Sequence, residues 1–139
     1  LTTSSAASDV YKRQVLNQLP NKNKVTVINP PRDMESFNIV NTETHDETLK
    51  VLSNNEIYFH ASEHETVGLP LYEAQNLGLK VVAPISSYTQ YFSPESVFLY
   101  NMNDPEDALK KLEDAQSSSI EKIDTLNYSE NWKIVLDNI

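Results

Sequence analysis

The chain has 139 residues, a formal net charge of −9 and no cysteine. This length suits one domain with one hydrophobic core, and the lack of cysteine excludes disulfides and thiolate metal sites. The acidic charge argues against a nucleic-acid-binding surface, because it repels a phosphate backbone. No apolar run approaches the ~20 residues that a membrane-spanning helix needs. We therefore expect a cytoplasmic protein with no transmembrane segment and no nucleic-acid partner.

The first residues differ in composition from the rest of the chain. Residues 1–8 are almost all small or polar and have no hydrophobic period, which predicts disorder. The stretch SSAASDVYKRQ also resembles the translated adapter remnant found at the ends of fragmentary sequence reads. We therefore expect residues 1–14 to be a disordered or non-native leader, and residues 15–139 to form the domain. An ordinary flexible N-terminus is the alternative.

After the leader, short apolar strands alternate with helices. In chain order we expect the end of a helix at 15–19, a strand at 25–28, an irregular stretch, a helix from Asp46, a strand at 57–60, a helix at 70–77 closed by Gly78, strands at 80–84 and 97–100, a helix capped by Asp104, and a last helix from Ser129. Apolar strands that alternate with helices predict a Rossmann-like parallel sheet sandwiched by helices.

The stretch SEHETVGLPLYEAQNLGLKVVAP, residues 62–84, begins where the strand at 57–60 ends. In parallel sheets, ligands bind beyond the carboxyl ends of the strands. Gly68 and Pro70 stand at the start of a helix, where unpaired backbone N–H groups bind phosphate without a lysine. Glu65 in the loop and Glu73 inside the helix flank this start, and carboxylates suit hydroxyl groups better than phosphate. Such a site fits a nucleotide sugar.

Each of these residues also has a purely structural interpretation. Glu73 is then a solvated carboxylate on a helix surface, and Glu65 an acidic loop residue that stabilises the helix start. For Gly78, which ends the helix, the structural interpretation is the one we prefer. His60 and His64 are four residues apart, a spacing that brings two imidazoles to one face only on a helix, so we expect no metal site in this strand end and loop.

Residues 62–84 resemble the signature of the retaining glycosyltransferases of the GT-B fold, the group 1 or family 4 class, which runs P-S-x-x-E-G-F-G-L-P-x-x-E-A-x-x-x-G-x-P-V. The chain matches this pattern at Ser62, Glu65, Gly68, Leu69, Pro70, Glu73, Ala74, Gly78 and Val81. It departs from the pattern at Ala61, Thr66, Val67 and Lys80.

The resemblance implies the C-terminal, donor-binding half of such an enzyme. That half would take part in transferring a sugar from a nucleotide-diphosphate sugar to a glycan, lipid or protein acceptor, with retention of configuration and without a metal or other cofactor. Glu65 is implied as the catalytic residue that contacts hydroxyl groups of the transferred sugar, and Glu73 as the residue that holds the ribose. The remaining implied donor contacts are Val67, Gly68, Leu69 and Pro70. Apart from the resemblance, His64 in the same loop is a possible contact with the donor sugar, although nothing in the sequence requires it.

The N-terminal GT-B domain, which holds the acceptor in this family, does not fit in a chain of this length. The first strands of the donor-binding half do not fit either. We therefore expect a truncated domain that is inactive by itself. Two alternatives stay open: a non-catalytic α/β module that binds nucleotides or another protein, and a GT-B-fold epimerase.

Overall fold

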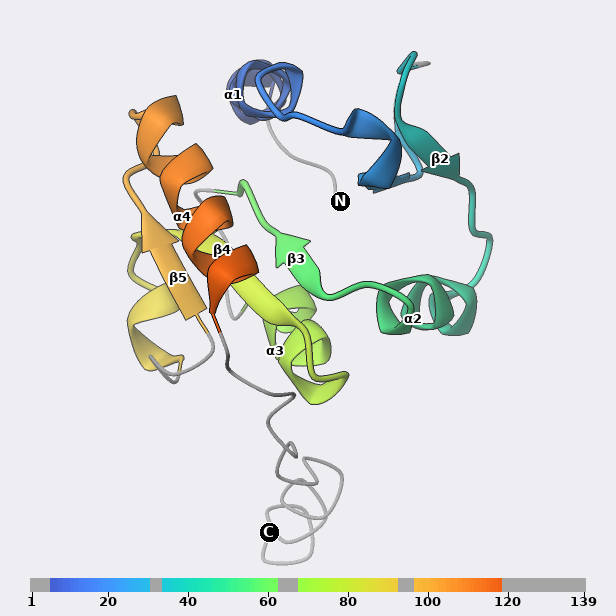
Figure 1. The fold of residues 1–139 in the computed structure, drawn as a ribbon. Coiled ribbons are helices and arrows are strands. Elements are labelled where there is room, and N and C mark those ends of the chain that lie inside the picture. The colour runs from blue at the N-terminus through green and yellow to red at the C-terminus, as the bar shows by residue number, and fades with distance from the viewer. Residues whose placement is uncertain (1–5, 31–33, 63–67, 93–96, 119–139) are drawn as a thin grey trace, which may run out of the picture.

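The computed structural model describes residues 6–30, 34–62, 68–92 and 97–118, and Figure 1 shows how their helices and strands are arranged. The helices are α1 (Ala6–Asn17), α2 (His45–Ser53), α3 (Leu69–Asn76) and α4 (Pro105–Ser117), with short 3-10 helices η1 (Lys22–Lys24) and η2 (Thr89–Tyr91). The strands are β1 (Thr26–Ile28), β2 (Asn38–Val40), β3 (Ile57–Phe59), β4 (Lys80–Pro84) and β5 (Val97–Tyr100). The alternation of strands and helices expected from the sequence is confirmed.

The strands form two parallel sheets. β1 pairs with β2, while β3, β4 and β5 form a second sheet in that order. The sequence predicted one parallel sheet, and the structure has two. The parallel α/β class is confirmed and is consistent with a Rossmann-like fold. Because the pairing is parallel throughout, the carboxyl ends of the strands in each sheet lie at one edge.

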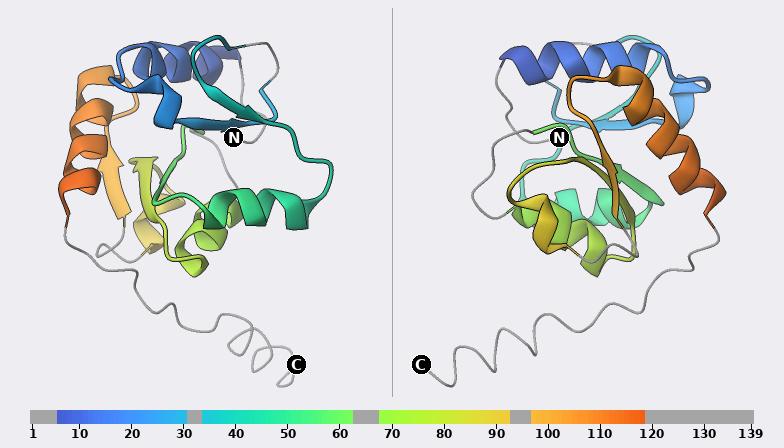
Figure 2. Two further views of the ribbon diagram at one scale, coloured as in Figure 1. Left: turned by 45° about the vertical axis from the view of Figure 1, so that its right-hand side comes forward. Right: turned by 90° about the vertical axis from the view of Figure 1, so that its left-hand side faces the viewer.

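Helices cover both faces of the three-stranded sheet. Val81 and Ala83 of β4 point into a core with α2 and α3, whereas Val82 between them points into a core with α1 and α4. This alternation follows from the two-residue period of a strand. Figure 2 shows α1 and α4 on one side of the strands and α2 and α3 on the other. The buried strand residues explain the nearly continuous apolar sequence of β4.

Helix α1 differs from the expected disordered leader. It spans residues 6–17, so residues 6–14 are helical. The ring of Tyr11 stacks on that of Tyr100, with centroids 6.0 Å apart, and Val15 is fully buried. Tyr11 and Val15 are one helical turn apart and pack into the same core as Leu112 of α4, which stabilises the helix. That these residues are not native to the protein stays a prediction.

The helix ends match the local sequence. Asp104 caps α4 by accepting from the backbone N–H groups of Glu106 and Asp107, as expected. At the end of α3, Gly78 has a φ of 80° and its N–H donates to the carbonyl of Gln75, which confirms the structural interpretation of this glycine.

The helix expected from Ser129 lies outside the described residues. No described helix has the length and apolar character needed to cross a membrane.

Candidate functional site

The start of α3 brings together four of the residues expected to bind a donor. Gly68 is the N-cap, Leu69 and Pro70 lie in the first turn, and Glu73 follows one turn later. Because α3 comes after β3, these residues lie beyond the carboxyl end of a parallel strand, as the sequence predicted. Glu65, His64 and Val67 lie outside the described residues.

Gly68 has a left-handed backbone conformation, with φ at 73° and ψ at 42°. Its carbonyl accepts from the N–H of Leu71 at 3.0 Å, which closes the first turn of α3. Pro70 fits in this turn because its missing N–H is one that a helix start leaves without an intrahelical partner. Since glycine has no side chain, Gly68 offers no side-chain oxygen to cap the first backbone N–H groups of α3.

Gly68 also has a packing role that the sequence did not indicate. A β-carbon placed at this position would lie 3.0 Å from Cδ2 and 3.3 Å from Cε2 of Tyr88. The aromatic ring therefore approaches the backbone where a side chain would otherwise stand. Contact between Gly68 and a donor stays a prediction, but the close approach of Tyr88 already explains a glycine here.

The carboxylate of Glu73 meets a histidine from the neighbouring helix. Oε1 of Glu73 lies 3.0 Å from Nε2 of His45, the first residue of α2. The Glu73 side chain is 32% exposed and that of His45 is 63% exposed. Glu73 is therefore neither buried nor fully solvated: one oxygen faces the imidazole, and the side chain remains accessible to a ligand.

The connection that leads to His45 is fixed at the edge of the two-stranded sheet. Asn29 has a φ of 47°, and its side chain accepts from the N–H of Thr42 at 2.8 Å and donates to Oγ1 of Thr42 at 3.0 Å. Thr44 and Glu47 then form a capping box at the start of α2. The backbone N–H groups that donate to Glu47 lower the pKa of its carboxyl group. These bonds place His45 beside α3.

His60 is a buried core imidazole. It is 1% exposed, and its Nδ1 lies 3.2 Å from the hydroxyl of Tyr58. Burial, followed by the positive charge of Lys12, lowers the pKa of His60 to about 4. His60 is therefore neutral near pH 7 and belongs to the packed core.

Burial likewise raises the pKa of Tyr11 to about 12. Within the described residues, no three His, Cys, Asp or Glu side chains gather as a metal-binding group would require.

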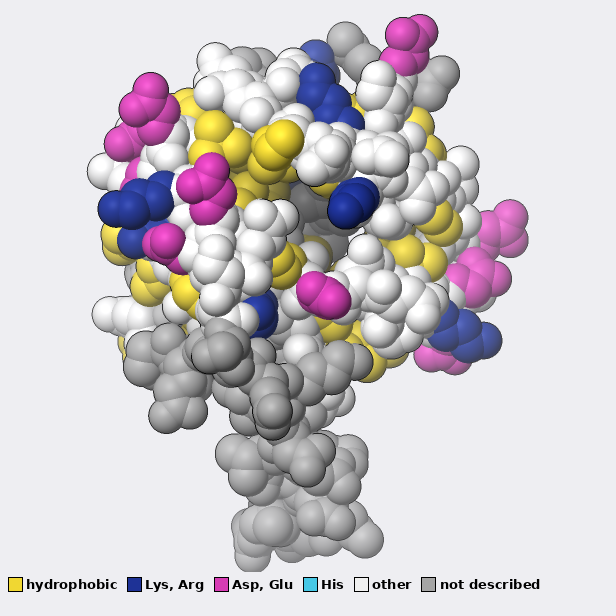
Figure 3. Space-filling model, viewed as in Figure 1, with side chains coloured by type: hydrophobic (Ala, Val, Ile, Leu, Met, Phe, Trp, Pro, Cys, Tyr) yellow, Lys and Arg dark blue, Asp and Glu magenta, His cyan; other side chains and the backbone are white. Residues whose placement is uncertain are grey.

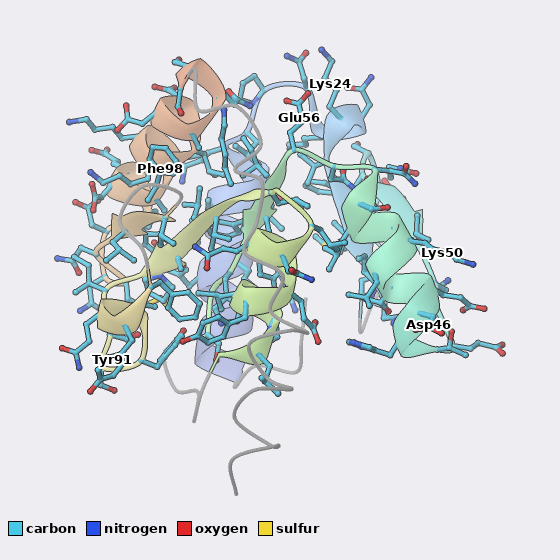
Figure 4. All side chains as sticks on the ribbon, turned by 90° about the horizontal axis from the view of Figure 1, so that it is seen from below. Lys24, Asp46, Lys50, Glu56, Tyr91 and Phe98 are labelled. Atoms are coloured by element: carbon cyan, nitrogen blue, oxygen red, sulfur yellow. The ribbon has the colours of Figure 1, made fainter. Side chains whose placement is uncertain are left out.

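The large hydrophobic side chains most exposed in the described ranges follow the carboxyl ends of β3 and β4. They are Leu69, Ile85 and Tyr91, which are 57%, 65% and 76% exposed. Figure 4 shows Tyr91 and Asp46 along one edge of the molecule and Lys24 and Glu56 along the opposite one. The edge with Tyr91 is the one at which α2 begins, so it also carries the start of the helix that supplies His45.

The side of the molecule with Lys24 and Glu56 (Figure 4) has a different surface. Figure 3 shows this side face-on, and Lys and Arg side chains are interspersed there with Asp and Glu around a hollow. On this face the basic side chains do not gather into a continuous patch, the usual feature of a nucleic-acid-binding surface.

Comparison of the chain with family models, with curated proteins and with solved structures gave no match.

Proposed function

We propose that the chain is the donor-binding part of a retaining glycosyltransferase of the GT-B fold and binds a nucleotide-diphosphate sugar at the start of α3. The observation that carries the proposal is the position of Glu73, one turn inside a helix that begins with Gly68, Leu69 and Pro70 at the carboxyl end of a parallel strand. This arrangement agrees with the resemblance of residues 62–84 to the signature of these enzymes.

The proposed chemistry follows from the types of group present. The partial positive charge at the start of α3 favours the diphosphate, and the partly exposed carboxylate of Glu73 accepts from ribose hydroxyl groups. Glu65 contacts the hydroxyl groups of the transferred sugar. Catalysis in the complete enzyme would rest on positioning and on stabilisation of the departing diphosphate. With one carboxylate near the sugar carbon, retention fits a same-face displacement better than the paired carboxylates of a retaining hydrolase.

The test is calorimetric titration of the chain with UDP, GDP and ADP and with one sugar derivative of each. We expect one nucleotide to bind more tightly than the others, and Glu73→Ala to weaken the diphosphate and its sugar derivative together. Glu113→Ala, at an exposed position on α4, is the matched control. Glu65→Gln should weaken only the sugar derivative. The proposal fails if no nucleotide binds, or if Glu73→Ala and Glu113→Ala bind alike.

The second candidate function is a non-catalytic interaction module, which the exposure of Leu69, Ile85 and Tyr91 favours. Each of these side chains follows a strand of the three-stranded sheet along the chain, and large exposed apolar patches mark contact sites for other molecules. A chain that binds no nucleotide but self-associates in light scattering, and becomes monomeric after Ile85→Ser and Tyr91→Ser, would support this second function.

A further inference from the structure

We infer that Tyr88 is a positioning residue for the start of α3, because it contacts the residues on both sides of 63–67. The inference rests on the proposed function for its consequence in ligand binding. The hydroxyl of Tyr88 donates to the backbone carbonyl of Ser62, and the ring of Tyr88 packs against Gly68. Tyr88 is 5% exposed, so both contacts are made inside the protein.

The position of Tyr88 is itself fixed by the end of β4. In the turn that follows this strand, the hydroxyl of Thr89 donates to the carbonyl of Pro84 at 2.9 Å and accepts from the N–H of Ser86 at 2.9 Å. Thr89 is 1% exposed, which protects these bonds from water. The turn therefore connects the ring of Tyr88 to the central strand of the three-stranded sheet.

A second support comes from His60. Its ring meets that of Tyr88 edge to face, with centroids 6.2 Å apart and planes at 87°, a favourable arrangement for two aromatic rings. The backbone N–H of His60 donates to the carbonyl of Val82 in β4 at 2.8 Å, which holds His60 to the sheet. Tyr88 is thus held by two parts of the same sheet and in turn holds Ser62 and Gly68.

The consequence concerns the geometry of the proposed donor site. Backbone N–H groups bind a diphosphate well only if they are already aimed at it, because ordering them on binding weakens the affinity. Ser62 and Gly68 stand on either side of the segment that holds Glu65, and Gly68 also begins the helix that carries Glu73. Tyr88 therefore sets where this helix begins without touching the ligand.

Tyr88→Phe is the sharpest variant, since it removes the hydroxyl and keeps the ring against Gly68. Tyr100→Phe is the matched control, because Tyr100 is also buried and its hydroxyl donates to a backbone carbonyl, that of His60, at 2.6 Å. His60 keeps its bond to β4 in the control. We expect both variants to lower the urea midpoint of unfolding to a similar extent, since each loses one buried hydrogen bond.

The two variants should differ in local structure and in binding. In the free protein, amide exchange at Gly68, Leu69 and Leu71, measured relative to Val82 in β4, should speed up in Tyr88→Phe and not in Tyr100→Phe. The affinity for the best nucleoside diphosphate of the panel should fall about fivefold in Tyr88→Phe, because binding then has to order a helix start that the lost hydrogen bond no longer holds. In Tyr100→Phe the affinity should stay within about 1.5-fold of wild type.

Equal affinities or equal relative exchange in the two variants would overturn the inference. If wild type binds no nucleoside diphosphate, the proposed function fails, and the exchange measurement decides the role of Tyr88 by itself. Faster exchange at the start of α3 in Tyr88→Phe alone would then support that role, and unchanged exchange would refute it.

Discussion

His45 and Glu73 join the start of one helix to the middle of another, and the two helices follow different sheets. Nε2 of His45 lies 3.0 Å from Oε1 of Glu73, so α2, which comes after β2, is linked to α3, which comes after β3. The carboxylate proposed to hold the ribose is therefore oriented by a residue far from the signature stretch. One of its oxygens faces the imidazole, and a ligand hydroxyl would complete its hydrogen bonding.

This pair should add little to stability. Both side chains are accessible to water, and exposed pairs of this kind contribute about 0.2–1 kcal/mol even when both partners are charged. We expect His45→Ala to lower the free energy of unfolding by no more than about 1 kcal/mol in urea denaturation. Asp46→Ala, next to it in the first turn of α2 and also exposed, is the control. A loss of several kcal/mol in His45→Ala alone would mean that the pair is a structural link and not an accessible site.

The close approach of Tyr88 to Gly68 predicts an unequal effect of alanine at the two glycines. Gly68 and Gly78 both have positive φ, 73° and 80°, so alanine costs about 1–2 kcal/mol of backbone strain at either position. At Gly68 the new β-carbon also meets the Tyr88 ring at 3.0 Å. We expect Gly68→Ala to be the more destabilising variant in thermal unfolding. Equal destabilisation would contradict the packing of Tyr88 on Gly68.

Lys80 should stabilise the end of α4. Its ammonium donates to the carbonyls of Ala115 at 2.8 Å and Ser118 at 2.7 Å, where the helix leaves carbonyl groups without intrahelical partners. Lys80→Met keeps the apolar stem and should lower the free energy of unfolding by about 1–2 kcal/mol. Lys110→Met, at an exposed position on the same helix, should have little effect. Similar losses in the two variants would argue against this cap.

His60 should make stability depend on pH in the acidic range. Its pKa is lowered from 6.5 to about 4 in the folded chain, so the unfolded chain binds a proton between these values and the folded chain does not. Stability is therefore fully present above pH 6.5 and falls as the pH drops towards about 4. The contribution lost is about 3 kcal/mol, at about 1.4 kcal/mol per pH unit.

This dependence is measured by urea unfolding of wild type and His60→Gln across the same pH range. The difference in free energy between the two proteins should shrink as the pH falls, because the variant has no imidazole to protonate. A constant difference across the range would show that His60 is not a buried neutral imidazole.

The elements predicted best are those with a strong local signal. The strands at 80–84 and 97–100 have the predicted bounds, and the cap of α4 at Asp104 was recognised from its residue type. Helix α2 begins at His45, one residue before the predicted start at Asp46, because Thr44 and Glu47 form a capping box. The spacing of Thr44 and Glu47 is visible in the sequence and specifies this start.

Other features depend on contacts between distant segments. β2 has three residues and pairs with β1, so nothing within the irregular stretch itself indicates a strand. Residues 6–14 are helical although the polar composition at the start of the chain suggests disorder, because Tyr11 and Val15 pack against α4. The contacts of His45 with Glu73 and of Tyr88 with Gly68 join residues from different elements. Their positions follow from how the helices pack on the strands, which no single segment of sequence specifies.

The most direct test of the proposed function asks whether Glu73 recognises ribose. The chain and its Glu73→Ala variant are titrated in a calorimeter with the best nucleoside diphosphate and with its 2′,3′-dideoxy analogue. A hydrogen bond between a charged group and the ribose hydroxyls is worth about 1.5–3 kcal/mol, so wild type should prefer the ribose form by about tenfold or more. Glu73→Ala should bind the two ligands equally. A wild-type chain without this preference, or a Glu73→Ala variant that keeps it, would contradict the proposed donor site.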